Sequence, residues 1–478
     1  MESRRDFLKL VASCGAAIIA FGTTRGAHLP EPGPLPDPET SGDPWDEVPR
    51  ILERIKPPAF PSREFNVENY GAVGDAKTDC TEAFRKAITA CNAASGGRVV
   101  VPKGEFLTGA IHLKSNVNLR VNSGATIRFT RDTKQYPLVF TRFEGMELMN
   151  YSPFLYALEQ ENIAISGQGI IDGSADAEHW WAWKSRTRPS KDLTATPNDR
   201  DVLIKMAETG VPVSKRIFGE GHYLRPQFIQ PYRCKNVLIE GVTLLNSPMW
   251  QVHPVLCANV TVRKLKINAD GPNTDGCDPE SCTDVLIEDC VFNTGDDCIA
   301  IKSGRNADGR RVNVPSQNII IRDCHMKNGH GGVTVGSEIS GGVHGVFAEH
   351  CQMDSPKLDI AIRLKNNAMR GGLLENIYVR DISVGQVGNA AVSIDFYYEE
   401  GKVGSFKPVV RNVTIEKLRT QKTQYALYLR GFENAPIEKV AFIDCDFSGV
   451  AKPNVVENVR DISVRNVRIN GTTLERLG

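Results

Sequence analysis

Residues 284–292 read Asp-Val-Leu-Ile-Glu-Asp-Cys-Val-Phe, and this nine-residue pattern decides the fold. Its second, fourth, seventh and ninth positions are apolar, which is the alternation of strands with one buried face. A two-residue break at Glu288-Asp289 separates the two halves. Residues 318–326 repeat the pattern as Asn-Ile-Ile-Ile-Arg-Asp-Cys-His-Met.

The same unit recurs along most of the chain. Further copies begin at Asn236, Asn259, Gly345, Asn376, Asn412 and Lys439, and looser ones begin at Asn116 and Asn162. Successive clear copies begin 23 to 36 residues apart, which is the spacing of a solenoid. Short strands at this spacing, with no long helical pattern between them, predict an all-β fold, the parallel β-helix.

Cysteine alternates with aliphatic residues at the seventh position of the unit. That position holds Val242, Leu265, Cys290, Cys324, Cys351, Ile382, Leu418 and Cys445. We therefore expect these cysteines to be small apolar core residues. Twelve cysteines in 478 residues do not indicate a disulfide framework. The sequence lacks two matched Cys-x-x-Cys pairs, so it does not indicate a structural zinc site.

One segment has a helical pattern. Residues 79–82 fit a capping box, and the apolar residues after them share one helix face: Ala83, Phe84, Ala87, Ile88 and Cys91. Gly96-Gly97 would end the helix. We expect a short N-terminal capping helix that closes the open end of the solenoid, with residues 98–102 as the first strand.

The sequence before this helix predicts export. Arg4-Arg5 precede a weakly apolar run over residues 10–22, which resembles a twin-arginine signal over residues 1–27. The run is too short for a stable membrane span. We therefore expect a periplasmic or extracellular protein. Lipid anchoring at Cys14 is a less favoured alternative, because most of the apolar run follows that cysteine.

The rest of the chain divides into an arm and one domain. Residues 28–62 are rich in proline and predict an arm or linker. Residues 63–478 predict a single β-helix catalytic domain, and residues 172–225 form an inserted loop without the repeat.

Composition narrows the class of protein. The chain has 57 basic and 57 acidic residues, 41% hydrophobic and 24% charged residues, which is typical of a globular protein. No basic excess exists to displace counterions, so nucleic acid is not an expected partner. The balanced charge and apolar content also exclude a disordered chain. A capped solenoid can exist as a monomer.

Four polar motifs interrupt the apolar pattern: residues 273–278 (NTDGCD), 295–297 (GDD), 329–331 (GHG) and 363–365 (RLK). Asp275 precedes Asp296 by 21 residues, and steps of 33 residues lead from Asp297 to His330 and on to Arg363. Each step is one coil, and residues one coil apart stack about 4.8 Å from each other. The four motifs should therefore form one patch.

The residue types in this patch point to glycosidic hydrolysis. Three neighbouring carboxylates repel one another, which raises some pKa and leaves one acid protonated near neutral pH. A protonated acid beside ionised carboxylates is what this hydrolysis requires. Asp296 and Asp297 can share a site only if the chain bends, and Gly295 permits that bend. Ca²⁺ binding is the competing interpretation, but Arg363 and Lys365 would repel a cation and suit a uronate carboxylate.

In their order, these motifs resemble those of glycoside hydrolase family 28, the polygalacturonases, from about Phe65 to the C-terminus. The resemblance implies a right-handed parallel β-helix, inversion of configuration and no cofactor or metal. It implies Asp296 as general acid, Asp275 and Asp297 as the residues that position and deprotonate water, and His330 as the group that tunes the acid. The implied substrate ligands are Arg363 and Lys365 for a galacturonate carboxylate, Asn273, which contacts substrate or orients Asp275, and Tyr398 or Tyr397.

Two further segments suggest how the substrate cleft ends. The insertion carries Trp180, Trp181, Trp183, Lys184, Arg186 and Arg188. Trp181 could stack on a sugar, or the tryptophans could simply pack the loop onto the solenoid. The basic loop over residues 303–311 resembles bacterial exo-acting relatives, and its Arg305 is a candidate substrate ligand. If both segments close one end of the cleft, the enzyme acts on chain ends and releases galacturonic acid.

The expected partner is a pectic polysaccharide or oligogalacturonide. A rhamnogalacturonan-specific or side-chain-specific hydrolase remains an alternative within the same family. A β-helix polysaccharide lyase or a non-catalytic carbohydrate-binding protein is less compatible with the three aspartates.

Overall fold

The structure is a computed structural model that describes residues 42–187 and 198–477. The predicted export signal, residues 28–41 of the predicted arm and Arg188 of the insertion lie outside these residues. The chain from Pro44 onward forms one compact unit.

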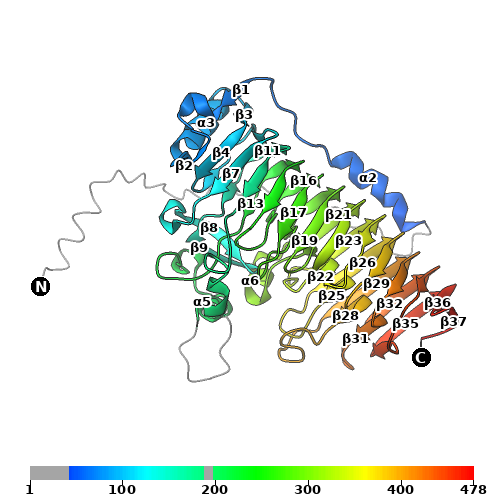
Figure 1. Cartoon of the computed structure of the whole chain (residues 1–478). Coiled ribbons are helices and arrows are strands. Elements are labelled where there is room, and N and C mark those ends of the chain that lie inside the picture. The colour runs from blue at the N-terminus through cyan, green and yellow to red at the C-terminus, as the bar shows by residue number, and fades with distance from the viewer. Residues whose placement is uncertain (1–41, 188–197, 478) are drawn as a thin grey trace, which may run out of the picture. The chain divides into compact units, whose positions relative to one another are not determined.

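Three sheets run the length of this unit, and their strands pair in parallel except for the last pair of the second sheet (Figure 1). The first sheet contains β1 (Glu64–Asn66), β3 (Gly97–Val101), β6 (Val117–Val121), β11 (Glu161–Gly167), β14 (Lys235–Glu240), β16 (Ala258–Arg263), β18 (Thr283–Glu288), β21 (Ser316–Arg322), β23 (Val343–Glu349), β26 (Leu373–Arg380), β29 (Val409–Glu416), β32 (Ile437–Ile443) and β35 (Val459–Arg465).

The second sheet contains β2 (Asp75–Asp79), β4 (Gly104–Thr108), β7 (Ala125–Phe129), β12 (Ile170–Asp172), β15 (Thr243–Leu245), β17 (Lys266–Ala269), β19 (Val291–Thr294), β22 (His325–Val335), β24 (Gln352–Met353), β27 (Ser383–Gln386), β30 (Arg419–Lys422), β33 (Asp446–Phe447), β36 (Val467–Ile469) and β37 (Thr472–Leu474).

The third sheet begins with β5 (Ile111–His112), β10 (Leu155–Leu158) and β13 (Ile229–Tyr232). It continues with β20 (Ile299–Ile301), β22, β25 (Leu358–Lys365), β28 (Ala390–Asp395), β31 (Tyr425–Arg430) and β34 (Val455–Glu457). Each coil contributes to each sheet in turn, so the predicted parallel β-helix is confirmed.

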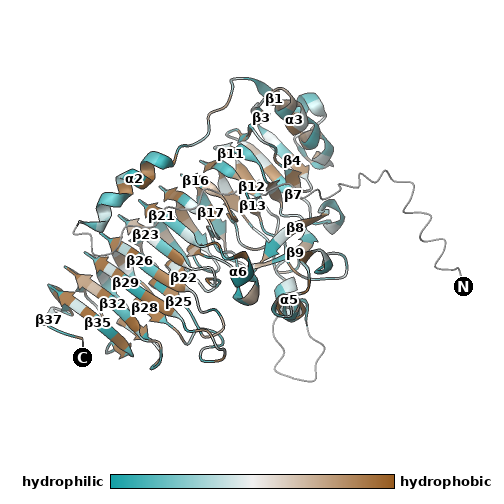
Figure 2. Cartoon of the chain, turned by 180° about the vertical axis from the view of Figure 1, so that it is seen from behind, coloured by the Kyte–Doolittle hydropathy of each residue, from teal (hydrophilic) through white to brown (hydrophobic). Residues whose placement is uncertain are grey.

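The repeat pattern explains the coil. The alternating apolar side chains of the unit are buried, as at Val285, Ile287 and Phe292, and each stacks on its equivalent one coil away, as Val285 does on Ile319. Figure 2 shows the same alternation of polar and apolar residues along the strands. The asparagine that opens many units adopts a left-handed backbone, with φ of 56° at Asn318, a conformation that asparagine tolerates well.

The eleven cysteines among the described residues are all buried, and none forms a disulfide. Their predicted role as small core residues is therefore confirmed.

The predicted capping helix is α3 (Thr81–Ala93), which buries the expected face. Its N-cap is Cys80 instead of Asp79, whose carboxylate accepts from the Thr81 amide, and Glu82 pairs with Arg85 instead of closing a capping box. Strands β1 and β2 precede α3, so the prediction that residues 98–102 form the first strand was wrong. Neither strand has a long apolar alternation that sequence could reveal.

The expectation of a single helical segment was also wrong. The structure adds α2 (Glu47–Arg54), α4 (Trp183–Arg186), α5 (Asp199–Glu208) and α6 (Asn306–Val312). These helices are too short to show a clear period in sequence. Two of them, α4 and α5, lie in the insertion and one, α6, in the expected basic loop. The insertion packs on an antiparallel hairpin of β8 (Leu138–Phe143) and β9 (Met146–Tyr151).

A short helical strap covers the outer face of the first sheet. Trp45, Val48, Ile51 and Ile55, in and around α2, pack against an outward-facing column of Leu286, Ile320 and Phe347. Arg54 adds an ion pair to Asp284 at 2.9 Å. This strap shields apolar side chains that a solvent-facing sheet would otherwise expose.

Replacing Ile51 by aspartate should detach the strap, because Ile51 is fully buried and burying an unpaired carboxylate is strongly unfavourable. We expect proteolysis within residues 44–62 to accelerate more than about tenfold, since 1.4 kcal/mol already gives that factor. Binding of a hydrophobic dye should rise in parallel. Arg50→Ala, at an exposed position of the same helix, is the control. Unchanged proteolysis of Ile51→Asp would show that the strap is not held by this contact.

Candidate active site

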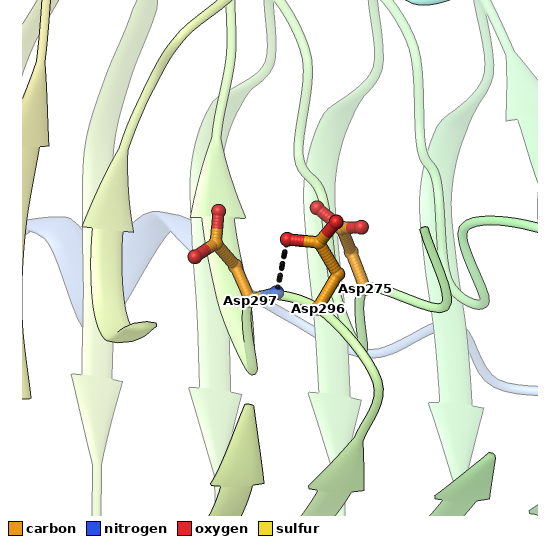
Figure 3. A group of neighbouring side chains, drawn as sticks. All are labelled: Asp275, Asp296 and Asp297. Carbon is orange, nitrogen blue, oxygen red and sulfur yellow. Dashed lines mark hydrogen bonds between the residues drawn. The ribbon is translucent and has the colours of Figure 1, made fainter. Parts of the chain in front are cut away.

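Three aspartates from two consecutive coils form the centre of the site (Figure 3). Asp296 and Asp297 lie in the turn between β19 and β20, and Asp275 lies one coil earlier. One oxygen from each carboxylate lies within 4.8 Å of the others. The Asp297 amide donates to Asp296 Oδ1 at 2.9 Å, which fixes the bend that lets adjacent residues face one site.

The predicted coil spacing is correct for most of the patch. The Gly276 amide donates to the Asp297 carbonyl at 3.0 Å, and the His330 amide donates to the Asp296 carbonyl at 3.1 Å. The spacing fails for Arg363, which pairs with Thr334, four residues beyond His330. Its long side chain compensates by reaching back, so that a guanidinium nitrogen lies 3.3 Å from the His330 carbonyl oxygen.

Two glycines of the motifs make room for the site. A Cβ at Gly295 would lie 2.1 Å from the carbonyl oxygen of Gly271 in the preceding coil. A Cβ at Gly331 would lie 2.8 Å from a carboxylate oxygen of Asp297. Any larger residue at these positions would displace the turn that carries Asp296 or the carboxylate of Asp297.

Asp296 is the most accessible of the three carboxylates. Its side chain is 18% exposed, against 4% for Asp275 and 1% for Asp297. Its Oδ1 accepts from His330 Nδ1 at 2.9 Å and its Oδ2 from Asn273 Nδ2 at 3.3 Å. Burial opposes ionisation, but the hydrogen bond and charge of His330 outweigh it and lower the pKa of Asp296. The same hydrogen bond raises the pKa of His330 to about 9.

Asp297 is bound by two cations. Lys365 Nζ lies 2.6 Å from its Oδ2 and an Arg363 nitrogen lies 3.4 Å from its Oδ1. Both cations also lie over the ring of Tyr398, at 5.0 and 5.4 Å from its centroid. Arg363 remains 17% exposed, so this pair can still meet a carboxylate brought by a ligand.

Asp275 is in a different environment. Lys302 Nζ lies 3.5 Å from its Oδ2. Burial, followed by the negative charge of Asp296, raises the pKa of Asp275 well above its ordinary value. The expectation that crowding raises some pKa in the cluster agrees with this direction, but the raised pKa belongs to Asp275, and that of Asp296 falls.

The three aspartate oxygens are close enough for one cation to bridge them. Two ammonium groups already offset much of the negative charge of the cluster, however, because Lys365 contacts Asp297 and Lys302 contacts Asp275. The donor set therefore fits a metal poorly, since a cation would have to displace or lie beside both lysines.

The comparisons with known proteins agree with this geometry. The model of Glycosyl hydrolases family 28 matches residues 218–470, which is more than half of the chain. The chain belongs to glycosyl hydrolase family 28. A second family model, Rhamnogalacturonase A/epimerase, pectate lyase-like, matches residues 64–188.

This family 28 chain is similar to several proteins of named activity. The chain is 45% identical to the hyperthermoactive exopolygalacturonase from Thermotoga maritima, whose structure it matches with a TM-score of 0.86 over 91% of this chain and 98% of that one. It is 27% identical to a probable polygalacturonase of Vitis vinifera over 85% of this chain and 79% of that protein. It is also 27% identical to an exo-poly-alpha-D-galacturonosidase of Dickeya chrysanthemi over 84% and 70% of the two chains.

The structure distinguishes the two candidate tyrosines of this family 28 site. Tyr398 lies beside Arg363 and Lys365, whereas Tyr397 packs on Phe432 and under Arg430. Asn273 lies in the site, but its Nδ2 donates to Asp296 at 3.3 Å instead of orienting Asp275, and its own Oδ1 accepts from Arg225 at 2.8 Å.

Trp181 lies next to the site. Its indole Nε1 donates to the Ser247 carbonyl at 2.8 Å, and a Cβ at Gly271 would come within 2.1 Å of its ring. The ring thus packs across two consecutive coils just before Asn273, as expected for a residue that holds the insertion onto the solenoid. Trp180 is buried and Trp183 packs on Tyr151 and Tyr223.

The prediction of Arg305 as a substrate ligand was wrong. Its side chain is buried, and its guanidinium is paired with four carboxylates at 3.2 to 3.4 Å: Glu144, Glu338, Glu399 and Glu400. A guanidinium so bonded links the insertion side of the site to the turn after β28 and is not free for a uronate.

Sequence reasoning missed Lys302, which contacts the cluster from the third sheet. The sequence did contain a signal for it. A lysine directly follows the apolar run of the buried strand β20, at a position where the run predicts another buried side chain.

Proposed function

We propose that this family 28 enzyme is an inverting, exo-acting polygalacturonase that removes galacturonic acid from the ends of pectic chains. The observation that carries the proposal is the joining of Arg363 and Lys365 to the aspartate cluster through Asp297. A uronate carboxylate bound by this pair would place its glycosidic bond beside Asp296. The named activities of the relatives support the same substrate class.

Accessibility assigns the roles of the three carboxylates. A general acid must touch the glycosidic oxygen, and Asp296 is the exposed member of the cluster. Asp275 and Asp297 are too buried to reach an anomeric carbon directly, but a water molecule between them and the sugar could lose its proton to either. This division favours attack by water over a covalent intermediate.

The cluster is more compact than in most inverting glycosidases, whose two carboxyl groups lie about 6.5–9.5 Å apart. Here the oxygens lie within 4.8 Å of one another. We still expect inversion, because the nucleophilic role would require a buried carboxylate to contact carbon.

The proton for the leaving group comes from the His330–Asp296 pair. Since the pKa of His330 is raised to about 9 and that of Asp296 is lowered, the pair holds one proton at neutral pH on His330, whose Nδ1 donates to Asp296 Oδ1 at 2.9 Å. A galacturonate carboxylate on Arg363 and Lys365 would offset their positive charge. That change raises the pKa of Asp296 and moves the proton toward the acid as substrate binds.

The insertion supports action at chain ends. The Trp181 ring covers the turns at Ser247 and Gly271 in the coils before Asp296. A polysaccharide continuing along these turns would collide with this ring. A substrate bound at the aspartate cluster would therefore be blocked by this ring on the side of the N-terminal coils.

A time course on de-esterified polygalacturonate tests the function. We expect galacturonic acid as the first product, no new ultraviolet absorbance and an initial anomer opposite in configuration to the substrate bond, as seen by NMR. Absorbing products would indicate a lyase. A ladder of oligomers from the first minutes would contradict exo action.

Trp181→Gly should open the closed side and let longer products appear beside galacturonic acid. The physical reason is the loss of the ring that blocks the turns at Ser247 and Gly271. Product lengths and the melting temperature should be measured together, with Trp45→Ala in the strap as a control far from the groove in the fold. Galacturonic acid as sole product of a folded Trp181→Gly variant would contradict the blocking role.

A rhamnogalacturonan-specific hydrolase is the second candidate, favoured by the match of residues 64–188 to the Rhamnogalacturonase A/epimerase model. Cleavage of rhamnogalacturonan without cleavage of polygalacturonate would select it.

We also propose that the chain is exported through the twin-arginine pattern at Arg4-Arg5 and acts in the periplasm or outside the cell. No helix among residues 42–187 and 198–477 is long and apolar enough to cross a membrane. Replacing both arginines by lysine should retain the protein in the cytoplasm, as fractionation would show.

A further inference from the structure

A buried lysine behind the aspartate cluster contacts three carboxylates at once. Lys302 Nζ lies 3.5 Å from Asp275, 3.8 Å from Asp278 and 3.2 Å from Glu338, and 4.1 Å from the ring centroid of Trp250. Its side chain is only 3% exposed. The ammonium is therefore shielded from bulk water, and these three carboxylates are the acidic groups that it contacts.

The three carboxylates that contact Lys302 differ in how many other hydrogen-bond or ion-pair partners they have. Glu338 is also paired with Arg305 at 3.2 Å. By contrast, neither carboxylate oxygen of Asp278, nor Oδ1 of Asp275, has a hydrogen-bond partner among the described residues. Burial and mutual repulsion raise the pKa of both Asp275 and Asp278. One ammonium thus serves two buried carboxylates that cannot both ionise without large cost.

We propose that Lys302 is a positioning residue that keeps Asp275 ionised as a base toward the attacking water, and that Asp278 competes with Asp275 for its charge. The proposal rests on the proposed hydrolytic function. Its physical basis is the shared ammonium at nearly equal distances from the two aspartates. Asp297 and Glu338 also face Lys302 electrostatically, and Lys365 of β25 and His253 are like charges that interact with it.

The competition predicts shifts of opposite sign in two variants. In Lys302→Met the positive charge is lost, so the pKa of Asp275 rises and the base is protonated at higher pH. The acidic limb of the kcat profile should then move up, by about 1–2 pH units. In Asp278→Asn the competitor is lost, so the charge of Lys302 is divided between Asp275 and Glu338 only. The pKa of Asp275 falls, and the acidic limb should move down by about 0.5–1 unit.

The measurement is the pH profile of kcat for wild type and both variants, with melting temperatures recorded alongside. Arg216→Met is the matched control, because Arg216 is an equally buried cation paired with Asp308 at 2.9 Å, outside the cluster. It should lose stability without moving the limb. Lys302→Arg should retain the wild-type limb if it folds, because the charge is kept.

The outcomes separate this role from a structural one. The proposal would be overturned if the acidic limb of the kcat profile stayed in place in both variants. It would also be overturned if the limb moved in the same direction in Lys302→Met and Asp278→Asn. If Lys302→Met does not fold, Asp278→Asn alone still decides, since an unmoved or upward limb there contradicts the competition. If wild type does not cleave polygalacturonate, the proposed function fails separately, and the same profiles are measured on the pectic substrate that it does cleave.

Discussion

Asp296→Asn should lower kcat by at least about 10²–10⁴-fold on polygalacturonate while the protein remains folded. General acid catalysis contributes a factor of this size. Asparagine can still accept from the Asp297 amide and the His330 ring, which now bond to Asp296 at 2.9 Å. It cannot give a proton to the leaving oxygen, so only the chemistry should suffer.

A substrate with an activated leaving group sharpens this test. Since a good leaving group needs little protonation, the loss in Asp296→Asn should shrink on a nitrophenyl galacturonide, provided that wild type cleaves it. The pKa of His330 should also fall from about 9 toward its ordinary value, because the anionic partner is gone. Asp289→Asn, at an exposed break of the repeat, is the control. An equal loss on both substrates would show that Asp296 is not the acid.

Lys365→Met should impair both binding and turnover, and this is the second large effect. From sequence alone, loss of Lys365 would mainly weaken uronate binding. The structure adds that Lys365 Nζ lies 2.6 Å from Asp297 and is almost fully buried. Its removal leaves a buried carboxylate with only Arg363 at 3.4 Å. We therefore expect KM to rise at least about tenfold and kcat to fall by at least as much.

Methyl-esterified substrate provides the decisive comparison for Lys365. Wild type should discriminate strongly against an ester at the cleavage subsite, because the ester cannot pair with a cation. The variant should lose much of this discrimination. Lys266→Met, at an exposed lysine of β17, should change neither KM nor kcat. Undiminished discrimination in a folded Lys365→Met variant would mean that Arg363 alone recognises the carboxylate.

Much of the site could be predicted because the fold converts sequence spacing into distance. Copies of one unit stack coil on coil, so motifs about one coil apart meet in space. That reasoning placed Asp275, Asp296 and His330 together correctly. It misplaced Arg363 by four residues in register, and the site survives only because arginine is long enough to reach back to Asp297.

Longer-range packing lay beyond this reasoning. Arg305 looked like a free surface cation, yet Glu144, Glu338 and Glu399 approach it from three other segments of the chain. Likewise, adjacent residues 397 and 398 are indistinguishable in sequence, and only the turn after β28 directs one ring to the cations. Contacts between distant segments leave no periodic pattern in the sequence.

The sequence by itself determined the parallel β-helix, its capping helix and the aspartate cluster, because each depends on a repeated local pattern or on coil spacing. Only the tertiary structure decided which carboxylate is exposed, which cations are free and which ammonium lies behind the base. Those properties follow from burial and from side chains that converge from distant segments. In a low-dielectric site they set the protonation of each group, and hence its chemical role.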